Sequence, residues 1–347
     1  MIGRTRMRFV DSLSDNLKSK TQNRKLVGTV ALVVTFAMCG ARAGAQQPTK
    51  IPRIGYLSPR STNPARIEAF RQGLHELGYV EGKNIVIESR NAEGKLDRLS
   101  HVAAELVRLK VDVIVTSSPA PTRAAKQATL TIPIVFAQDS DPVASGFVAS
   151  LARPGGNITG LSTLAPELSG KRLELLKEVV PKLSRVAVLG TSTSPSTAPT
   201  LKETELAAGA SKVQLQYLDV LDPKDIETAF RTAAKGRADA VLVLAGPVVF
   251  FQRTQIAELA VKSRLPAIYP QTEFTEAGGL MYYGANTPDM YRRAATFVDK
   301  ILKGAKPADL PVEQPTKFEF IINLKAAKQI GLTISPNVLA RADKVIK

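Results

Sequence analysis

The stretch IPIVFAQDSDPVASGFVASLARPGGNITGLST, residues 132–163, decides the fold class of this chain. It begins with a buried apolar strand that passes straight into a polar loop, GlnAspSerAspPro (138–142). This is the form of a ligand loop at the carboxyl end of a parallel strand. The later segment ArgProGlyGlyAsn (153–157) combines a proline with two glycines and predicts a crossing between two lobes. Together the two segments predict a cleft.

Short apolar strands alternate with amphipathic helices on both sides of this stretch. Before it, the pattern predicts strands at 53–57, 84–89 and 111–116, with a helix after each one. After it, the alternation starts again with a helix at 167–180 and continues to a strand at 266–269. Repeated βα order predicts parallel sheets with right-handed crossovers.

The length of 347 residues suits two such domains, each large enough to bury its own core. We therefore expect an α/β fold with two doubly wound parallel-sheet lobes joined by a three-segment hinge. The first lobe is expected to comprise residues 50–160 plus 275–310. The second lobe is expected to comprise residues 161–274 plus 311–347, which include a closing tail.

The N-terminus has the three parts of a secretory signal peptide. A basic segment (1–25) precedes an apolar run (26–38), and AlaGlyAla (43–45) provides a cleavage site. An uncleaved membrane anchor is the alternative, but the apolar run is shorter than the roughly 20 residues that a bilayer core needs. We expect residues 1–45 to be a cleaved signal peptide and the mature protein to be periplasmic. The single cysteine, Cys39, would be removed with the signal peptide.

The basic composition does not indicate a nucleic-acid partner. The formal net charge is +16, but residues 1–45 contain eight Lys/Arg and two Asp/Glu, which leaves +10 for the mature chain. That charge is scattered along amphipathic helices. Aromatic residues make up 5% of the chain and none is tryptophan, so no base-stacking platform is expected.

The sequence lacks the constellations that enzymes and metal sites require. No glycine-rich phosphate loop follows the first strand, and His75 and His101 lie far apart within predicted helices. Asp139 and Asp141 form a DxD pair, but the following residues do not supply the further oxygen ligands of a calcium loop. Asp141 precedes Pro142 and is more simply a cap, which leaves Asp139 as the ligand candidate. We expect no enzymatic activity, metal or cofactor.

Polar loops at strand ends are the candidate ligand contacts, because open α/β sheets bind ligands there. In the first lobe, hydroxyl groups near helix N-termini suit a carboxylate, with helix capping as their alternative role. In the second lobe, Glu273 suits an ammonium group, with Phe274 and Tyr283 as apolar walls. The residues predicted to bind the ligand are Ser58, Ser117, Ser118, Thr122, Asp139, Ser162, Pro247, Glu273 and Tyr283.

Four segments carry a family resemblance: GLHELGYVEGKNIVIESRNAEG (73–94), residues 132–162, KRLELLKEVVP (171–181) and AAKQIGLTI (326–334). In combination they resemble the ABC transporter substrate-binding proteins of the uncharacterised or TrpX-like kind. The resemblance covers the whole mature chain, about residues 50–347, and implies a type I periplasmic binding protein fold.

The resemblance also implies a function. A protein of this kind captures a small amino acid-like or carboxylate ligand between two lobes and passes it to an ABC permease in the inner membrane. Some relatives are associated with aromatic amino acids, whereas Arg60 after the first strand suits an acidic ligand. We expect a monomer. The alternative is a periplasmic sensor that reports its ligand to a signalling partner.

Overall fold

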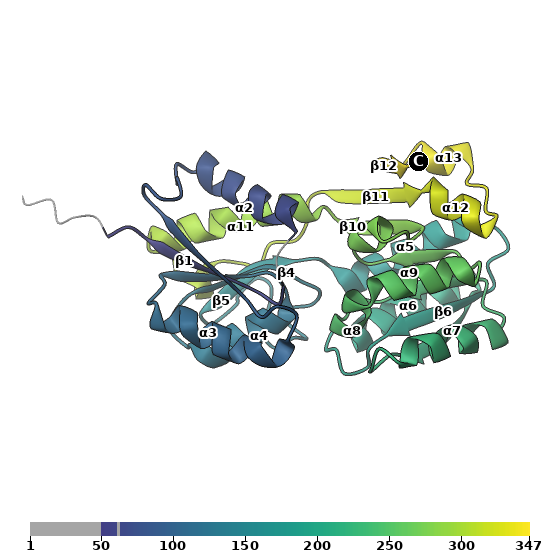
Figure 1. Ribbon diagram of the computed structural model, residues 1–347, viewed down its shortest axis with the longest axis horizontal. Helices are drawn as coiled ribbons and strands as arrows, with labels where there is room; N and C mark the ends of the chain where they lie inside the picture. Colours follow the sequence, from purple (N-terminus) through teal and green to yellow (C-terminus); the bar gives the residue numbers. More distant parts are fainter. Residues whose placement is uncertain (1–49, 61–62) are drawn as a thin grey trace, which may run out of the picture. The chain divides into compact units, whose positions relative to one another are not determined.

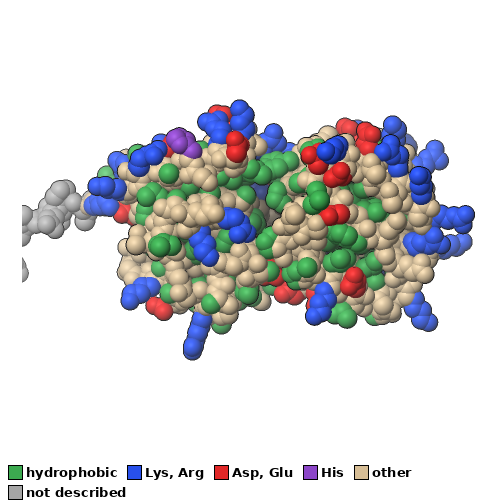
Figure 2. All heavy atoms as spheres, turned by 90° about the horizontal axis from the view of Figure 1, so that it is seen from below, with side chains coloured by type: hydrophobic (Ala, Val, Ile, Leu, Met, Phe, Trp, Pro, Cys, Tyr) green, Lys and Arg blue, Asp and Glu red, His purple; other side chains and the backbone are tan. Residues whose placement is uncertain are grey.

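The computed structural model describes residues 50–60 and 63–347, so the predicted signal peptide at 1–45 lies outside the described residues. Residues Ile51–Lys347 form one unit by their contacts, and it contains two sheets (Figure 1). Within this described part, no helix combines the length and the apolar character that crossing a membrane requires. Lys and Arg side chains are dispersed over the face seen in Figure 2, as their scattered sequence positions predict.

The first sheet has five parallel strands in the order β2-β1-β3-β4-β5. Strand β1 lies inside the sheet and β2 lies at its edge, which is the strand order of a doubly wound unit. Every residue of β3 and β4 is buried, in keeping with the apolar runs at 113–115 and 134–137 that begin them. The strands are β1 (Arg53–Ser58), β2 (Val86–Asn91), β3 (Val113–Thr116), β4 (Ile134–Asp139) and β5 (Ile158–Ser162).

Helices cover both faces of this sheet. On one face, Phe70 and Leu74 of α2 pack with Met290 and Tyr291 of α11 against the side chains of the central strands. The other face packs against α3 and α4, after a short 3-10 turn, η1 (Leu96–Arg98). The helices are α2 (Pro64–Glu76), α3 (Leu99–Arg108), α4 (Pro119–Ala128) and α11 (Thr287–Leu302).

The second sheet has seven strands in the order β12-β11-β10-β9-β8-β6-β7. All neighbouring strands are parallel except β10 and β11, which are antiparallel. The strands are β6 (Arg185–Gly190), β7 (Gln214–Asp219), β8 (Ala240–Val243), β9 (Ala267–Tyr269), β10 (Met281–Ala285), β11 (Phe318–Asn323) and β12 (Lys344–Ile346).

The second sheet is also covered on both faces. Leu173 and Leu176 of α5 contribute to the core on one face, and Phe230 of α7 and Ile256 of α9 contribute to the core on the other. The α/β class with two doubly wound lobes is therefore confirmed. The helices are α5 (Ala165–Val179), α6 (Thr197–Ser211), α7 (Asp225–Lys235), α8 (Pro247–Phe251), α9 (Arg253–Lys262), α10 (Glu273–Glu276), α12 (Leu324–Ile330) and α13 (Pro336–Leu339).

The structure corrects the position of the first crossing. ArgProGlyGlyAsn (153–157) is a turn that precedes β5 within the first lobe, and it does not connect the lobes. Asn157 Nδ2 donates to Ile132 O at 2.8 Å, which ties this turn to the segment before β4. The chain leaves the first sheet after Ser162 and enters α5 at Ala165. Proline and glycine therefore mark a turn here rather than a lobe boundary.

The second boundary is also corrected. Residues 275–310 were expected in the first lobe, but β10 belongs to the second sheet because it pairs with β9 and β11. The chain returns to the first lobe only after Ala285, where Asn286 caps α11 by accepting from Asp289 N at 2.9 Å. It crosses again after the 3-10 turn η2 (Pro307–Asp309) and enters β11.

Candidate functional site

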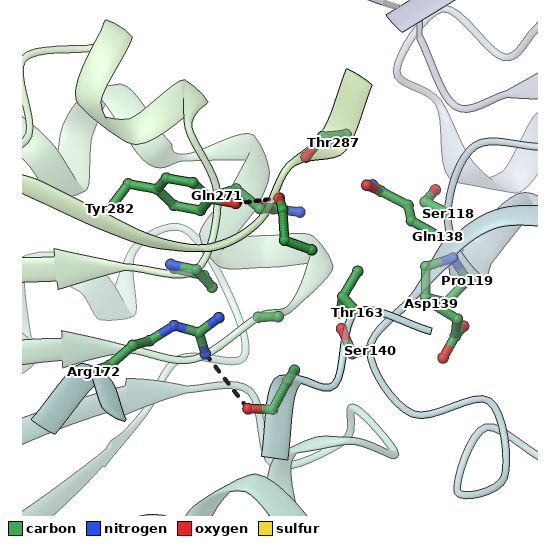
Figure 3. A pocket seen from close by; sticks show the side chains of 14 residues that line it. Ser118, Pro119, Gln138, Asp139, Ser140, Thr163, Arg172, Gln271, Tyr282 and Thr287 are labelled. Atoms are coloured by element: carbon green, nitrogen blue, oxygen red, sulfur yellow. Dashed lines mark hydrogen bonds between the residues drawn. The ribbon is translucent and has the colours of Figure 1, made fainter. Parts of the chain in front are cut away.

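A pocket lies where loops at the ends of the first sheet face loops and strand ends of the second (Figure 3). The first lobe contributes residues that follow β3 and residues at the end of β4, and the second contributes residues of α5 and β10 and residues that follow β8 and β9. Residues of two crossings, Thr163 and Thr287, complete the wall. The lining residues are Ser118, Pro119, Gln138, Asp139, Ser140, Thr163, Ala165, Arg172, Ala245, Pro270, Gln271, Tyr282, Ala285 and Thr287.

Arg172 of α5 is the cation of this pocket. The residue is buried, and its guanidinium donates from Nε to Tyr283 O at 2.8 Å and from Nη1 to Ala165 O at 3.5 Å. Burial lowers the pKa of Arg172 to about 10, so the group is still charged at neutral pH. No carboxylate forms an ion pair with it in the described part of the chain. A ligand carboxylate would compensate this buried charge.

Further polar groups line the pocket around this cation. Among the described residues, none donates a hydrogen bond to the buried Gln271 Oε1, so this atom can accept one from a ligand. Across the pocket, the Ser118 side chain makes no capping bond to α4, so the helix does not use its hydroxyl. Gln138 of β4 points from the same side toward the opposite wall (Figure 3). The pocket therefore offers an acceptor and a cation on one wall, and a hydroxyl group, an amide group and the Asp139 carboxyl group on the other.

Asp139 lines the pocket, but its carboxylate is engaged by the loop that follows. Oδ1 accepts from Asp141 N at 2.9 Å and from Ser145 Oγ at 3.2 Å, whereas the buried Oδ2 has no hydrogen-bond partner among residues 50–60 and 63–347. Burial raises the pKa of Asp139 to about 7. Asp141 Oδ1 accepts from Ala144 N at 2.9 Å, which is the capping role predicted for it. Asp139 thus orders the loop through Oδ1, and the contact of Asp139 with a ligand stays a prediction.

The raised pKa of Asp139 predicts a pH dependence of stability. Asp139 keeps its proton up to about pH 7 when the chain is folded, whereas in the unfolded chain its pKa has the ordinary aspartate value of 3.8. Between these values the folded state binds more protons, so the free energy of unfolding falls as pH rises. Asp139→Asn keeps the acceptor for Asp141 and should remove this fall. Thermal unfolding should show a melting temperature a few degrees above wild type at about pH 8 and no gain at about pH 4. Parallel pH profiles for the two proteins would contradict the assignment.

Seven of the nine predicted ligand residues lie outside the pocket: Glu273, Tyr283 and five others. The hydroxyl groups of two of these five make local contacts: Thr122 Oγ1 lies 2.7 Å from Thr116 Oγ1, and Ser162 Oγ accepts from Leu164 N at 3.2 Å. Hydroxyl side chains commonly satisfy nearby backbone groups in this way. The five residues are Ser58, Ser117, Thr122, Ser162 and Pro247.

The second-lobe candidates are also displaced from the pocket. Glu273 forms an ion pair with Arg66, and Phe274 stacks on Tyr269 with ring centroids 4.8 Å apart. Tyr283 packs against Phe318 at 6.2 Å, on the opposite side of β10 from Tyr282. Successive side chains of a strand point to opposite faces, so the pocket receives Tyr282 in place of Tyr283.

Two lobes with a polar pocket between the ends of their strands define a two-lobed solute-binding protein. Residues 61–346 match the family model of the ABC transporter substrate binding proteins, and the chain belongs to this family. The predicted family is thereby confirmed. It is a family of binding proteins that serve ABC transport.

Named relatives agree with this membership. The chain is 25% identical over 265 residues to the tyrosine-binding protein of Clostridioides difficile strain R20291. The aligned residues make up 76% of this chain and 76% of that protein. It is similar to the solved structure of a Streptococcus pneumoniae ABC domain in complex with L-Trp, with 26% identity and a TM-score of 0.78, covering 85% of this chain and 99% of that one. The solved structure of a conserved domain protein from Vibrio cholerae is 29% identical, with a TM-score of 0.77, and the match covers 85% of this chain and 100% of that one. These matches confirm the type I periplasmic binding protein fold.

Proposed function

We propose that this protein captures an α-amino acid between its lobes in the periplasm and delivers it to an ABC permease of the inner membrane, without chemical conversion. The observation that carries the proposal is the buried guanidinium of Arg172, which lines the pocket without a carboxylate partner among the described residues. A carboxylate is the ligand group that a guanidinium binds best, because two parallel hydrogen bonds accompany the charge interaction.

The same wall suits the other half of an amino acid head group. Gln271 Oε1 lacks a donor in the described part of the chain, and a ligand ammonium group would supply one. Ala245 and Ala285 present small side chains to the pocket, where the ligand's own side chain would lie. The relatives named for tyrosine or solved with L-Trp support an aromatic amino acid.

Ligand binding should be coupled to movement of the walls. The free space in the pocket is about 60 Å³, whereas small-molecule sites typically measure several hundred Å³. An amino acid is larger than this space, so the lobes must separate for it to enter and the side chains that line the pocket must rearrange to hold it. Once bound, a ligand that contacts both walls favours the closed arrangement by its greater affinity for it.

A thermal-shift screen of the common L-amino acids tests this function. At saturating concentration, one or a few amino acids, with tyrosine and tryptophan the leading candidates, should raise the melting temperature by several degrees, because a ligand that binds only the folded state stabilises it. Titration calorimetry of the best candidate should then give one site per chain and return the ligand unchanged. No shift with any amino acid, or consumption of the ligand at catalytic protein concentration, would overturn the proposal.

A further inference from the structure

Arg66 is a buried arginine at the start of α2 in the first lobe. The helix begins at Pro64, and Asn63 caps it by accepting from Ala65 N at 3.0 Å. The Arg66 guanidinium lies over the ring of Tyr291 in α11, 5.8 Å from its centroid. The guanidinium thus packs on the aromatic ring, and only 9% of the side chain is exposed.

Its partner belongs to the other lobe. Glu273 is the first residue of α10, and its carboxylate forms an ion pair with Arg66 Nη2. The Glu273 side chain is also 9% exposed. Neither residue lines the pocket, so the pair connects the lobes without belonging to the proposed ligand contacts.

Both ends of the ion pair are linked to pocket walls. Tyr291, beneath Arg66, donates from its hydroxyl to Ser117 O at 3.0 Å, directly before the lining residue Ser118. Glu273 follows the lining residue Gln271 by two positions. The pair is therefore placed to hold the two walls at a fixed separation.

A second arginine of the first lobe makes a contact of the same kind. Arg60, two residues after β1, lies over the ring of Phe251 at the end of α8, 5.5 Å from its centroid. Helix α8 begins two residues after the lining residue Ala245. Arg60 therefore contacts the second lobe and does not line the pocket.

We propose that Arg66 and Glu273 form an interlobe latch, a pair of positioning residues that raises ligand affinity by stabilising the closed arrangement without touching the ligand. The inference rests on the proposed function, since it concerns how that site retains an amino acid. Loss of one member of a buried ion pair leaves the other charge desolvated and unpaired. Closure then becomes less favourable, and the ligand dissociates faster.

The test compares Glu273→Gln with a matched control, Glu178→Gln. Glu178 pairs with Arg341 inside the second lobe, where both side chains are far more exposed, at 37% and 49%. Glu273→Gln should raise the dissociation constant of the amino acid found in the screen by about tenfold, mainly through a faster dissociation rate. Small-angle scattering of the ligand-free protein should show a larger radius of gyration. The control should leave both quantities at the wild-type values.

The exchanged pair, Arg66→Glu with Glu273→Arg, separates a latch from damage to the fold. It should recover much of the affinity that Glu273→Gln loses, and every variant should retain a cooperative melting transition. A change in affinity below about twofold in Glu273→Gln together with an unchanged radius of gyration would overturn the latch. If wild type binds no amino acid, the proposed function fails, and scattering of the ligand-free proteins still decides whether the pair favours closure.

Discussion

Arg172→Gln is expected to lower the affinity for the amino acid ligand about 100-fold, because it removes the only guanidinium among the described residues that line the pocket. The substitution leaves a ligand carboxylate buried without a countercharge, and removal of one partner of such a pair is costly. Titration calorimetry measures the loss directly. The effect should appear mainly in the dissociation rate.

The ligand provides the second half of this experiment. Wild type should bind the carboxamide of the same amino acid about 100-fold more weakly than the acid, whereas Arg172→Gln should discriminate little between the two. Arg172→Lys should keep part of the preference because it keeps a charge, although it loses the bidentate geometry. Lys171→Gln is the matched control, since Lys171 is exposed and pairs with Glu174 on the surface. Equal binding of acid and carboxamide by wild type would rule out Arg172 as the carboxylate partner.

Arg172 also shows why the site is harder to predict than the fold. In the sequence it stands in KRLELLKEVVP beside Lys171, where a run of charges on an amphipathic helix is typical of a solvated face. The structure exposes 42% of the Lys171 side chain and buries Arg172. Helix periodicity places Arg172 with the apolar side chains Leu168 and Leu176, which are buried on the same face. This periodicity is the one signal in the sequence that distinguishes Arg172 from its exposed neighbour.

The parallel sheets were predictable because βα alternation requires crossover connections, whereas the lobe boundaries depended on strand pairing. The tail after residue 275 contains an apolar aromatic strand that fits either sheet by its composition. Its pairing with β11 in the second sheet is a contact between segments more than thirty residues apart, which local patterning does not encode. The same limit explains Tyr283: alternation predicts that one of two neighbouring tyrosines faces the pocket, but only the register of β10 shows that it is Tyr282.

Gly160→Ala is expected to destabilise the protein by about 3 kcal/mol. Gly160 lies in β5 with φ at +152°, a region that other residues rarely adopt. A Cβ there would lie 2.1 Å from Phe136 O and 2.8 Å from the Phe136 ring. Since Phe136 is the residue paired with Gly160 in β4, the added methyl group must push the two strands apart.

Urea unfolding followed by circular dichroism measures this loss, and Gly209→Ala is its control. Gly209 lies near the end of α6, and a methyl group added there would meet no atom within 4 Å, so alanine should stabilise the protein by up to about 1 kcal/mol. The strand variant should also bind ligand more weakly, because β5 leads directly into Thr163 at the pocket. Unfolding of Gly160→Ala at the same urea concentration as wild type would refute this expectation. In that case the close approach of the β4 and β5 backbones does not require glycine at position 160, and the pocket does not depend on that glycine.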